Sequence, residues 1–360
     1  MSLPCLEGLG ALLGGDTLIE EAITAVIVVC LAGFVMLLCW LWPALASEDK
    51  PLRGRSDNRI TVASLRVYPI KSCAGHKVSE WSFTAKGLEH DRAWMVMGPE
   101  GRFRTQRQLA KMKLVKPSLP AGPGEPITLT ASGMPDLTVP VVHEGPRKTV
   151  KVWKATCEAI DQGDEAGKWL SKFLEEDGLR LVRMPDDFDR ATNSAYGKGV
   201  TRFADGFPIL LASEESLEET AQRIEAKTGA RPANFTFDRF RPNIVVAGGQ
   251  PFEEDWWTKV LIGGAGMRLV KPCDRCKVPT IDPVTLQAGK EPTETMLEFR
   301  TPGALGLDKD KFGASDVFFG QNIIPEVTSG IIKKGDTVTI LRVKNSYVSP
   351  AVLDGRKKAD

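Results

Sequence analysis

Cys273-Asp274-Arg275-Cys276 holds the one closely spaced cysteine pair of the chain, and it follows a predicted strand at Met267–Val270. A thiolate is a soft metal ligand, and a neighbouring guanidinium favours the deprotonated thiol. Two cysteines are too few for a structural zinc site, which takes four ligands. A thioredoxin-like dithiol precedes a helix, whereas Pro279 and Pro283 follow here. Other motifs must therefore decide which chemistry the pair serves.

Five further short motifs stand at predicted turns or strand ends. They are Val67-Tyr68-Pro69-Ile70-Lys71-Ser72-Cys73, Asp91-Arg92-Ala93-Trp94, Asp205-Gly206-Phe207-Pro208, Phe240-Arg241-Pro242-Asn243 and Phe319-Gly320-Gln321. Taken singly, each has an ordinary structural explanation. Lys71 and Ser72 fit a solvated turn, Arg92 fits a pair with Asp91, and Arg241 fits an edge charge. Only their combination with the cysteine pair indicates a common site.

In this order, the six motifs resemble the MOSC family, the molybdenum-cofactor sulfurase C-terminal domain family, and within it the amidoxime-reducing members. The resemblance extends from about Ile60 to Val343. It implies a β-rich mixed α/β fold, with an N-terminal β-barrel-like domain at 60–183 and a MOSC-type β-barrel domain at 184–345. A C-terminal tail at 346–360 would follow.

The resemblance implies a molybdopterin-type molybdenum cofactor (Mo-molybdopterin). This group carries a phosphate and a dithiolene, and it requires basic side chains and backbone N–H groups to hold its negative charge. Cys276 is implied as the molybdenum ligand and the catalytic residue. The other residues implied to contact the cofactor are Lys71, Ser72, Arg92, Gly206, Phe207, Arg241, Asn243, Cys273, Asp274, Arg275 and Asn322.

Six of these residues carry more specific expectations. Arg241 and Asn243 are two residues apart, so a strand would project both to one side. Gly206 and Phe207 would contribute backbone contacts, since they lack the hydroxyl groups that related enzymes can carry there. Arg275 is expected to favour the Cys276 thiolate. The family pattern does not explain Asp274, because a carboxylate beside an anionic group must point away or pair with a cation.

By the same resemblance, the chain is an oxidoreductase that reduces N-hydroxylated substrates such as amidoximes, hydroxylamines and N-oxides. The sequence has no flavin, haem or GxGxxG motif, so electrons must come from outside. The family points to cytochrome b5 and NADH-cytochrome b5 reductase as partners. Two alternatives stay open, namely a sulfur-transfer protein and a non-enzymatic carrier of the molybdenum cofactor.

An apolar segment near the N-terminus predicts a membrane anchor at 22–42, after a short segment at 1–21 and before a linker at 43–59. No charge occurs between Glu21 and Glu48, and the run is long enough to cross a bilayer core of roughly 30 Å. It is too long for a cleaved signal peptide and lacks a basic region before it. Basic residues follow the run, which predicts a single-pass protein with a cytosolic C-terminal part. The mitochondrial outer membrane follows from the resemblance alone.

The overall composition excludes some classes of function. Lys and Arg total 47 against 46 Asp and Glu, giving a net charge of +1, which argues against a general nucleic-acid binder. The seven cysteines are irregularly spaced, which does not match a secreted disulfide framework and favours a reducing compartment.

The elements that would position these motifs are mostly strands. Helices are expected at 164–176 and 213–228, from their apolar periodicity. Strands are expected at 60–67, 94–97, from 102 onward, 127–131, 137–142, 149–153, 244–247, 259–262, 267–270 and 337–343. The tryptophans Trp153, Trp169, Trp256 and Trp257 are interpreted as core or strand-surface aromatics without a functional role.

Overall fold

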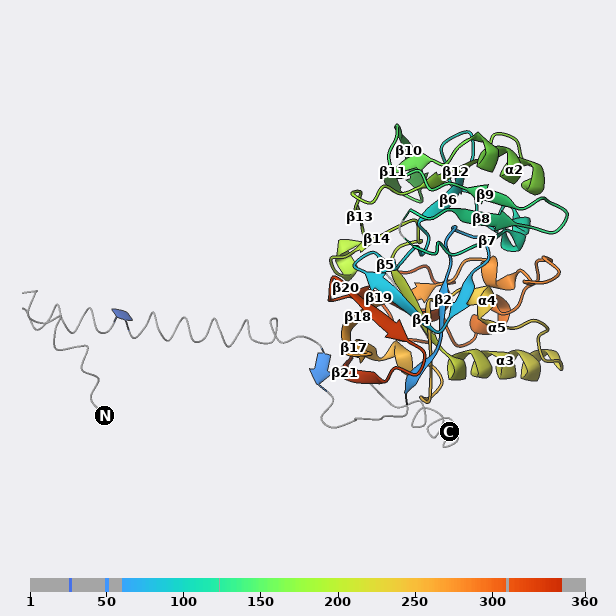
Figure 1. Cartoon of the computed structure of the whole chain (residues 1–360). Helices are drawn as coiled ribbons and strands as arrows, with labels where there is room; N and C mark the ends of the chain where they lie inside the picture. Colours follow the sequence, from blue (N-terminus) through green and yellow to red (C-terminus); the bar gives the residue numbers. More distant parts are fainter. Residues whose placement is uncertain (1–25, 28–48, 52–59, 123, 309–310, 345–360) are drawn as a thin grey trace, which may run out of the picture. The chain divides into compact units, whose positions relative to one another are not determined.

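The computed structural model describes residues 26–27, 49–51, 60–122, 124–308 and 311–344 (Figure 1). The chain divides into two units, Met1–Lys50 and Pro51–Asp360, and the candidate site lies in the second. The expected anchor at 22–42 falls outside the described residues except for Val26 and Ile27, and the expected tail at 346–360 falls outside entirely. Within the described ranges no helix is both long and apolar enough to cross a bilayer. The anchor therefore stays a prediction.

The largest sheet joins strands from both ends of the second unit. Within it the strands lie in the order β21 (Val338–Lys344), β17 (Trp257–Ile262), β18 (Ala265–Asp274), β19 (Phe318–Pro325), β15 (Ile209–Ser213), β16 (Ile244–Ala247), β2 (Thr61–Val67) and β3 (His76–Val78). Only β15 and β16 pair in parallel among these neighbours. Parallel neighbours need a crossover, and α3 (Glu214–Thr228) lies in this one.

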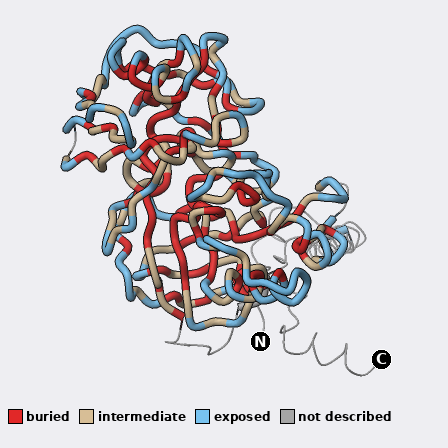
Figure 2. The backbone as a smooth tube through the Cα atoms, turned by 90° about the vertical axis from the view of Figure 1, so that its right-hand side faces the viewer, coloured by how far each residue is buried: buried red, intermediate tan, exposed pale blue. Residues whose placement is uncertain are grey.

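The side chains of this sheet explain its stability. Leu65, Leu211, Ile244, Val260 and Ile323 come from five different strands and are all fully buried in one cluster. Figure 2 shows long buried stretches of backbone in the interior and exposed residues mainly in the outer turns. Burial of such side chains contributes roughly 1.5–3 kcal/mol each. The sheet is therefore a rigid base for the loops that leave its ends.

A second, smaller sheet lies in the N-terminal part of this unit, with α2 (Asp164–Leu174) beside it (Figure 1). Its strand order is β10 (Arg147–Val152), β11 (Ala155–Asp161), β12 (Arg180–Arg183) and β6 (Trp94–Met97). Along α2, Ala166, Trp169 and Leu170 recur at helical spacing and bury one face against this sheet.

The remaining elements are short. The small sheets contain β4 (Glu80–Thr84), β5 (Gly87–Leu88), β7 (Lys116–Pro117), β8 (Ile127–Thr130), β9 (Leu137–Val139), β13 (Arg190–Ala191), β14 (Val200–Thr201) and β20 (Ser329–Lys333). The short helices are α4 (Phe237–Phe240) and α5 (Thr293–Met296), with 3-10 turns at Ala110–Leu114, Ser194–Tyr196, Glu253–Asp255 and Val278–Thr280. The strand β1 (Asp49–Pro51) precedes them all. The β-rich character expected from the sequence is confirmed.

Several of the expected strands differ from the structure, and two of the differences bear on the site. The expected strand from Arg102 is not formed, and only isolated bridges join Phe103 to Met97 and Arg102 to Lys151. The expected strand at Met267–Val270 is longer, because β18 runs on through Cys273 to Asp274 and pairs with β19. The first cysteine of the pair is therefore held by a sheet.

A buried ion pair supports β19, which carries residues next to the site. Arg300 donates to Asp255 at 2.6 Å and to the Phe318 carbonyl at 2.8 Å, while Gln321 donates to Asp255 at 2.7 Å. Asp255→Asn would leave the buried guanidinium without its counter-charge, so we expect a loss of about 3 kcal/mol in the free energy of unfolding. Urea denaturation measures this.

The matched control for that prediction is Glu219→Gln, which breaks a pair with Arg223 on the exposed part of α3. Surface pairs of this kind contribute less than about 1 kcal/mol. Equal effects of the two substitutions would contradict the structural role assigned to Asp255.

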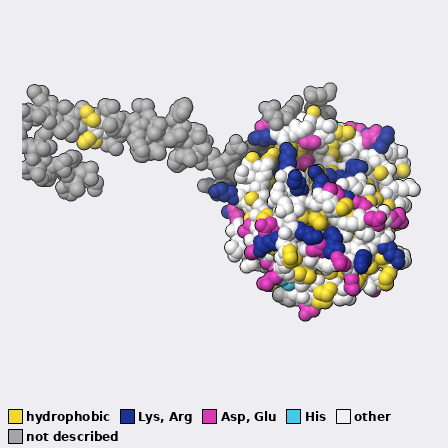
Figure 3. All heavy atoms as spheres, turned by 90° about the horizontal axis from the view of Figure 1, so that it is seen from above, with side chains coloured by type: hydrophobic (Ala, Val, Ile, Leu, Met, Phe, Trp, Pro, Cys, Tyr) yellow, Lys and Arg dark blue, Asp and Glu magenta, His cyan; other side chains and the backbone are white. Residues whose placement is uncertain are grey.

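Charged side chains of both signs are mixed on the face shown in Figure 3. Ion pairs of this kind include those of Arg147, on β10, with Glu158 and with Asp187, the second at 2.6 Å. The basic charge of this face is thus partly neutralised by acidic neighbours. The more informative charges are those that line a cavity.

Candidate functional site

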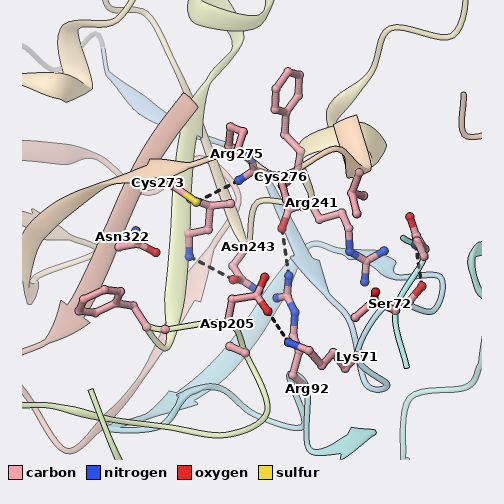
Figure 4. Close-up of a pocket in the computed structure, with 18 of the residues that line it drawn as sticks. Lys71, Ser72, Arg92, Asp205, Arg241, Asn243, Cys273, Arg275, Cys276 and Asn322 are labelled. Atoms are coloured by element: carbon pink, nitrogen blue, oxygen red, sulfur yellow. Dashed lines mark hydrogen bonds and ion pairs between the residues drawn. The ribbon is translucent and has the colours of Figure 1, made fainter. Parts of the chain in front are cut away.

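An open cavity of about 790 Å³, counting the space at its mouth, gathers residues from distant parts of the chain. Every site residue expected from the sequence lines it except Asp274. Its wall consists of Lys71, Ser72, Arg92, Thr105, Gln106, Arg107, Ala204, Asp205, Gly206, Phe207, Leu210, Phe240, Arg241, Asn243, Cys273, Arg275, Cys276, Val278 and Asn322. In Figure 4 the cysteine pair lies at the top of the view, and Lys71 and Arg92 lie at the bottom.

Lys71 follows β2 and buries its ammonium group in the wall. It donates to the Phe203 carbonyl at 2.8 Å and to Asp205 Oδ1 at 2.5 Å. Burial lowers the pKa of Lys71, and the Asp205 carboxylate offsets part of that effect. An ammonium group has three donors, so one remains for a ligand. Lys71 can therefore contribute both charge and a hydrogen bond to an anion.

Ser72 and Arg92 lie beside Lys71 in left-handed backbone conformations, with φ of 67° and 48°. The Ser72 carbonyl accepts a 2.6 Å hydrogen bond from Gln106, which fixes this turn. The Arg92 guanidinium bonds Asp91 at 2.5 Å and the Arg241 carbonyl at 3.1 Å. Arg92 is thus already paired, and it adds positive charge to the wall from a fixed position.

Arg241 is the arginine of the cavity that lacks a partner. Its side chain is buried, and its Nη1 and Nη2 atoms have no hydrogen-bond partner among the described residues. The guanidinium lies 4.2 Å from the centre of the Tyr68 ring, and burial lowers its pKa. A buried donor group of this strength is unfavourable unless it binds something. The two free nitrogens therefore indicate an anion-binding position.

The expectation that Arg241 and Asn243 share a strand is wrong. Arg241 ends α4 in a left-handed conformation with φ of 59°, and β16 begins only after Asn243. Pro242 between them cannot continue the helix. The Asn243 amide accepts from the Leu210 N–H and donates to the Arg66 carbonyl, both at 3.1 Å. Both residues line the cavity, but Asn243 uses its amide to tie neighbouring strands together.

The cysteine pair is asymmetric in the structure. Cys273 is partly buried and accepts a hydrogen bond from Arg275 Nη1 at 3.0 Å, whereas Cys276 is exposed in the loop after β18. Burial raises the pKa of the Cys273 thiol, and Arg275 opposes that rise. The Arg275 guanidinium donates to Cys273 and to the Phe240 carbonyl, and it also interacts electrostatically with Cys276, which agrees with the expectation that it acts on the pair through its charge.

Asp274 does not line the cavity, and its expected role in cofactor binding is not supported by this placement. It forms an ion pair with Lys271 instead. Successive residues of a strand face opposite sides, so Asp274 points away when Cys273 faces the cavity. An irregularity in β18 between Pro272 and Asp274 adjusts the strand there. The Asp274 carboxylate therefore does not line the cavity.

Three remaining positions complete the predicted set. A Cβ atom added to Gly206 would meet nothing within 4 Å, so this glycine is not required by a close approach. Phe207 is buried and lines the wall with its ring. Asn322, on β19, donates to the Lys271 carbonyl at 3.2 Å and so braces the strand that carries Cys273.

Sequence reasoning missed several wall residues. Asp205 was quoted within a motif without a role, and no pattern in the sequence singles out Thr105, Gln106 or Arg107. Trp153 was interpreted as a surface or core aromatic, but it lies near the rim and contacts both Asp205 and Arg107.

With this geometry in place, comparison with known proteins defines the class. Residues 59–177 match the MOSC N-terminal beta barrel domain, and residues 198–339 match the MOSC domain. The chain belongs to the MOSC family.

Within that family, the chain is similar to the protein named "Mitochondrial amidoxime-reducing component 1". It is 34% identical to the Mus musculus protein over 308 residues, 81% of this chain and 86% of the relative. Identity to the Homo sapiens protein is 34% over 298 residues, 78% of this chain and 83% of the relative. The Bos taurus "Molybdenum cofactor sulfurase" is 28% identical over 254 residues, which are 66% of this chain and 29% of that longer protein.

The cavity fits an anionic molybdenum cofactor on three counts. Arg241 offers two free donors to an anion, Lys71 keeps one donor available, and Cys276 offers an exposed thiol. No group of three or more His, Cys, Asp or Glu side chains that could hold a metal ion occurs in the described part of the chain. A metal that binds Cys276 would therefore need further ligands from a cofactor. A molybdenum-cofactor-related function follows from the family and agrees with this wall.

Proposed function

We propose that this protein is a molybdenum-cofactor oxidoreductase that reduces N-hydroxylated compounds. The observation that carries the proposal is the buried Arg241 guanidinium, whose Nη1 and Nη2 have no hydrogen-bond partner among the described residues, in a cavity that also contains the exposed Cys276 thiol. Similarity to proteins named for amidoxime reduction supports the choice of substrate. The same similarity supports a mitochondrial location.

The proposed roles divide along the cavity wall. Lys71 and Arg241 would bind the anionic part of the cofactor, and Arg92 would add positive charge from its fixed position beside them. Cys276 would bind molybdenum as a thiolate. When bound, the group would supply two electrons that, with two protons, convert an N–O bond to N–H and water. The chain itself would position the substrate, bind the negative charge of the cofactor and shield the site from solvent.

The electrons for each turnover must come from a separate donor under this proposal. Cytochrome b5 and NADH-cytochrome b5 reductase remain the proposed donors, on the ground of family resemblance. An anchor at 22–42 would place the protein on the same membrane as such donors and raise their effective concentration. These partners and the outer-membrane location stay predictions.

A test of the proposed function starts from the full chain, purified with its bound group. Molybdenum and pterin content should each approach one per protein. With reduced methyl viologen as electron donor, the protein should convert benzamidoxime to benzamidine.

Each contrary result in that experiment has a definite meaning. Molybdenum and pterin without any turnover would overturn the enzyme in favour of a cofactor carrier. A molybdenum-free protein that carries a cysteine persulfide would overturn it in favour of sulfur transfer.

A further inference from the structure

Trp153 occupies a backbone position that a tryptophan rarely adopts. The β10–β11 hairpin pairs Val152 with Ala155, so Trp153 and Lys154 form a two-residue turn, and Trp153 has φ of 56°. Such turns favour Asn and Gly, because a bulky side chain is strained at positive φ. Its side chain is also 44% exposed, so core packing does not account for it. Strain of this kind tends to occur at functional sites.

Two of the side chains that Trp153 contacts line the cavity. Its indole Nε1 donates to Asp205 Oδ1 at 2.9 Å. The Arg107 guanidinium lies 4.2 Å from the centre of its ring, and the Phe103 ring lies 5.4 Å away. Both Asp205 and Arg107 line the cavity. A turn of the N-terminal sheet thus holds two wall residues, one of which belongs to the loop between β14 and β15.

Asp205 is the one carboxylate among the described residues that line the cavity. Its Oδ1 accepts from both Lys71, at 2.5 Å, and Trp153, at 2.9 Å, whereas Oδ2 has no hydrogen bond within the described part of the chain. The side chain is 69% exposed. Oδ2 is therefore free to accept a hydrogen bond from a bound molecule.

The carboxylate is also held rigidly and near the cysteine pair. Arg190 donates to the Asp205 carbonyl at 2.7 Å and to the Arg202 carbonyl at 2.9 Å, so the backbone of this loop is fixed. Asp205 lines the same cavity as Cys273 and Cys276. The neighbouring Lys71 ammonium group holds the pKa of the Asp205 carboxyl below its usual range.

We infer that Asp205 Oδ2 accepts a hydrogen bond from an N–H group of the substrate, and that Trp153 is the residue that positions Asp205 for this. The inference rests on the proposed function and deepens it. It predicts that the enzyme prefers N-hydroxylated substrates that carry an N–H donor beside the N–O bond, as amidoximes do. An N-oxide without any N–H cannot make this contact.

The experiment compares KM for two substrates, benzamidoxime and pyridine N-oxide, with the holoenzyme and a chemical electron donor. Asp205→Asn presents an amide N–H where Oδ2 was, so KM for benzamidoxime should rise about tenfold or more, because a hydrogen bond to a charged group is lost. KM for pyridine N-oxide should stay within about twofold. Rates are expressed per bound molybdenum, so that partial loss of cofactor does not enter KM.

Trp153→Phe tests the positioning role while it keeps the ring and its packing. Lys71 still holds Oδ1 in this variant, so KM for benzamidoxime should rise less, by about threefold, with kcat nearly unchanged. The double variant should be no worse than Asp205→Asn alone, since Trp153 acts through Asp205. The matched control is Asp187→Asn, an exposed carboxylate that pairs with Arg147 outside the cavity, and it should change neither KM.

The two possible failures are distinguishable. If Asp205→Asn raises KM for both substrates equally, or for neither, the inference about substrate recognition is overturned while the proposed function stands. An additive effect of Trp153→Phe in the double variant would overturn the positioning role. Wild-type holoenzyme that reduces neither substrate would overturn the proposed function together with the inference.

Discussion

Cys276→Ser is expected to fold normally and to lose at least about 100-fold in benzamidoxime reduction, together with most of its molybdenum. The thiol is exposed in the loop after β18, so the change leaves no buried cavity and removes no hydrogen bond shown by the structure. A serine hydroxyl is a hard and weakly acidic group, which cannot replace a thiolate on a soft metal. Thermal unfolding, metal content and turnover of the same preparation measure the three parts of this prediction.

Cys273→Ser is the matched control, because it changes the other sulfur of the pair. Burial raises the pKa of the Cys273 thiol, and the serine hydroxyl can accept the bond that Arg275 now donates to Cys273. We therefore expect this variant to keep its molybdenum and to lose less than about tenfold in activity. The reverse pattern, with molybdenum lost only from Cys273→Ser, would assign the metal to Cys273 and refute the proposed role of Cys276.

The sequence predicted the composition of this site better than its geometry. The six short motifs contain most of the charged and sulfur-bearing wall residues, because each motif includes a chemically distinctive side chain at a turn or strand end. Lys71, Arg92 and Cys276 are examples in which residue type alone suggests the chemistry. Their convergence on one cavity could not be read from spacing, since it depends on how β2, β16 and β18 pair within one sheet.

The errors share a physical cause, which is that local pattern does not determine which atom a side chain touches. The proposed strand through Arg241 failed because Pro242 separates a helix end from β16. The hydrogen bond from Arg275 to Cys273 was not predictable either, because it depends on β18 continuing past its predicted end. Asp274 could pair with Lys271 only because both lie at the irregular end of the same strand. Trp153 contacts a loop 52 positions away in sequence, a relation that only tertiary structure defines.

Arg241→Met is expected to have opposite effects on cofactor binding and on stability. Bound pterin should fall to a small fraction of the wild-type content, because the two free guanidinium nitrogens are removed. The cofactor-free protein should become more stable, by about 1–2 kcal/mol in urea denaturation. A buried charge without a hydrogen-bond partner is unfavourable, and a methionine of similar length fills the same space without that penalty. The lost contact with the Tyr68 ring opposes this gain by a smaller amount.

Arg92→Met is the control for the loss of any arginine from this wall. The Arg92 and Arg241 guanidinium groups both lie over the Tyr68 ring, 4.3 Å and 4.2 Å from its centre. Arg92 is paired with the buried Asp91 carboxylate at 2.5 Å, so its loss leaves an uncompensated charge and should destabilise the cofactor-free protein by about 3 kcal/mol. Two similar substitutions in one wall should thus shift stability in opposite directions. If Arg241→Met also destabilises the cofactor-free protein, its guanidinium has a stabilising partner in that state, and the anion-binding position must be sought elsewhere in the cavity.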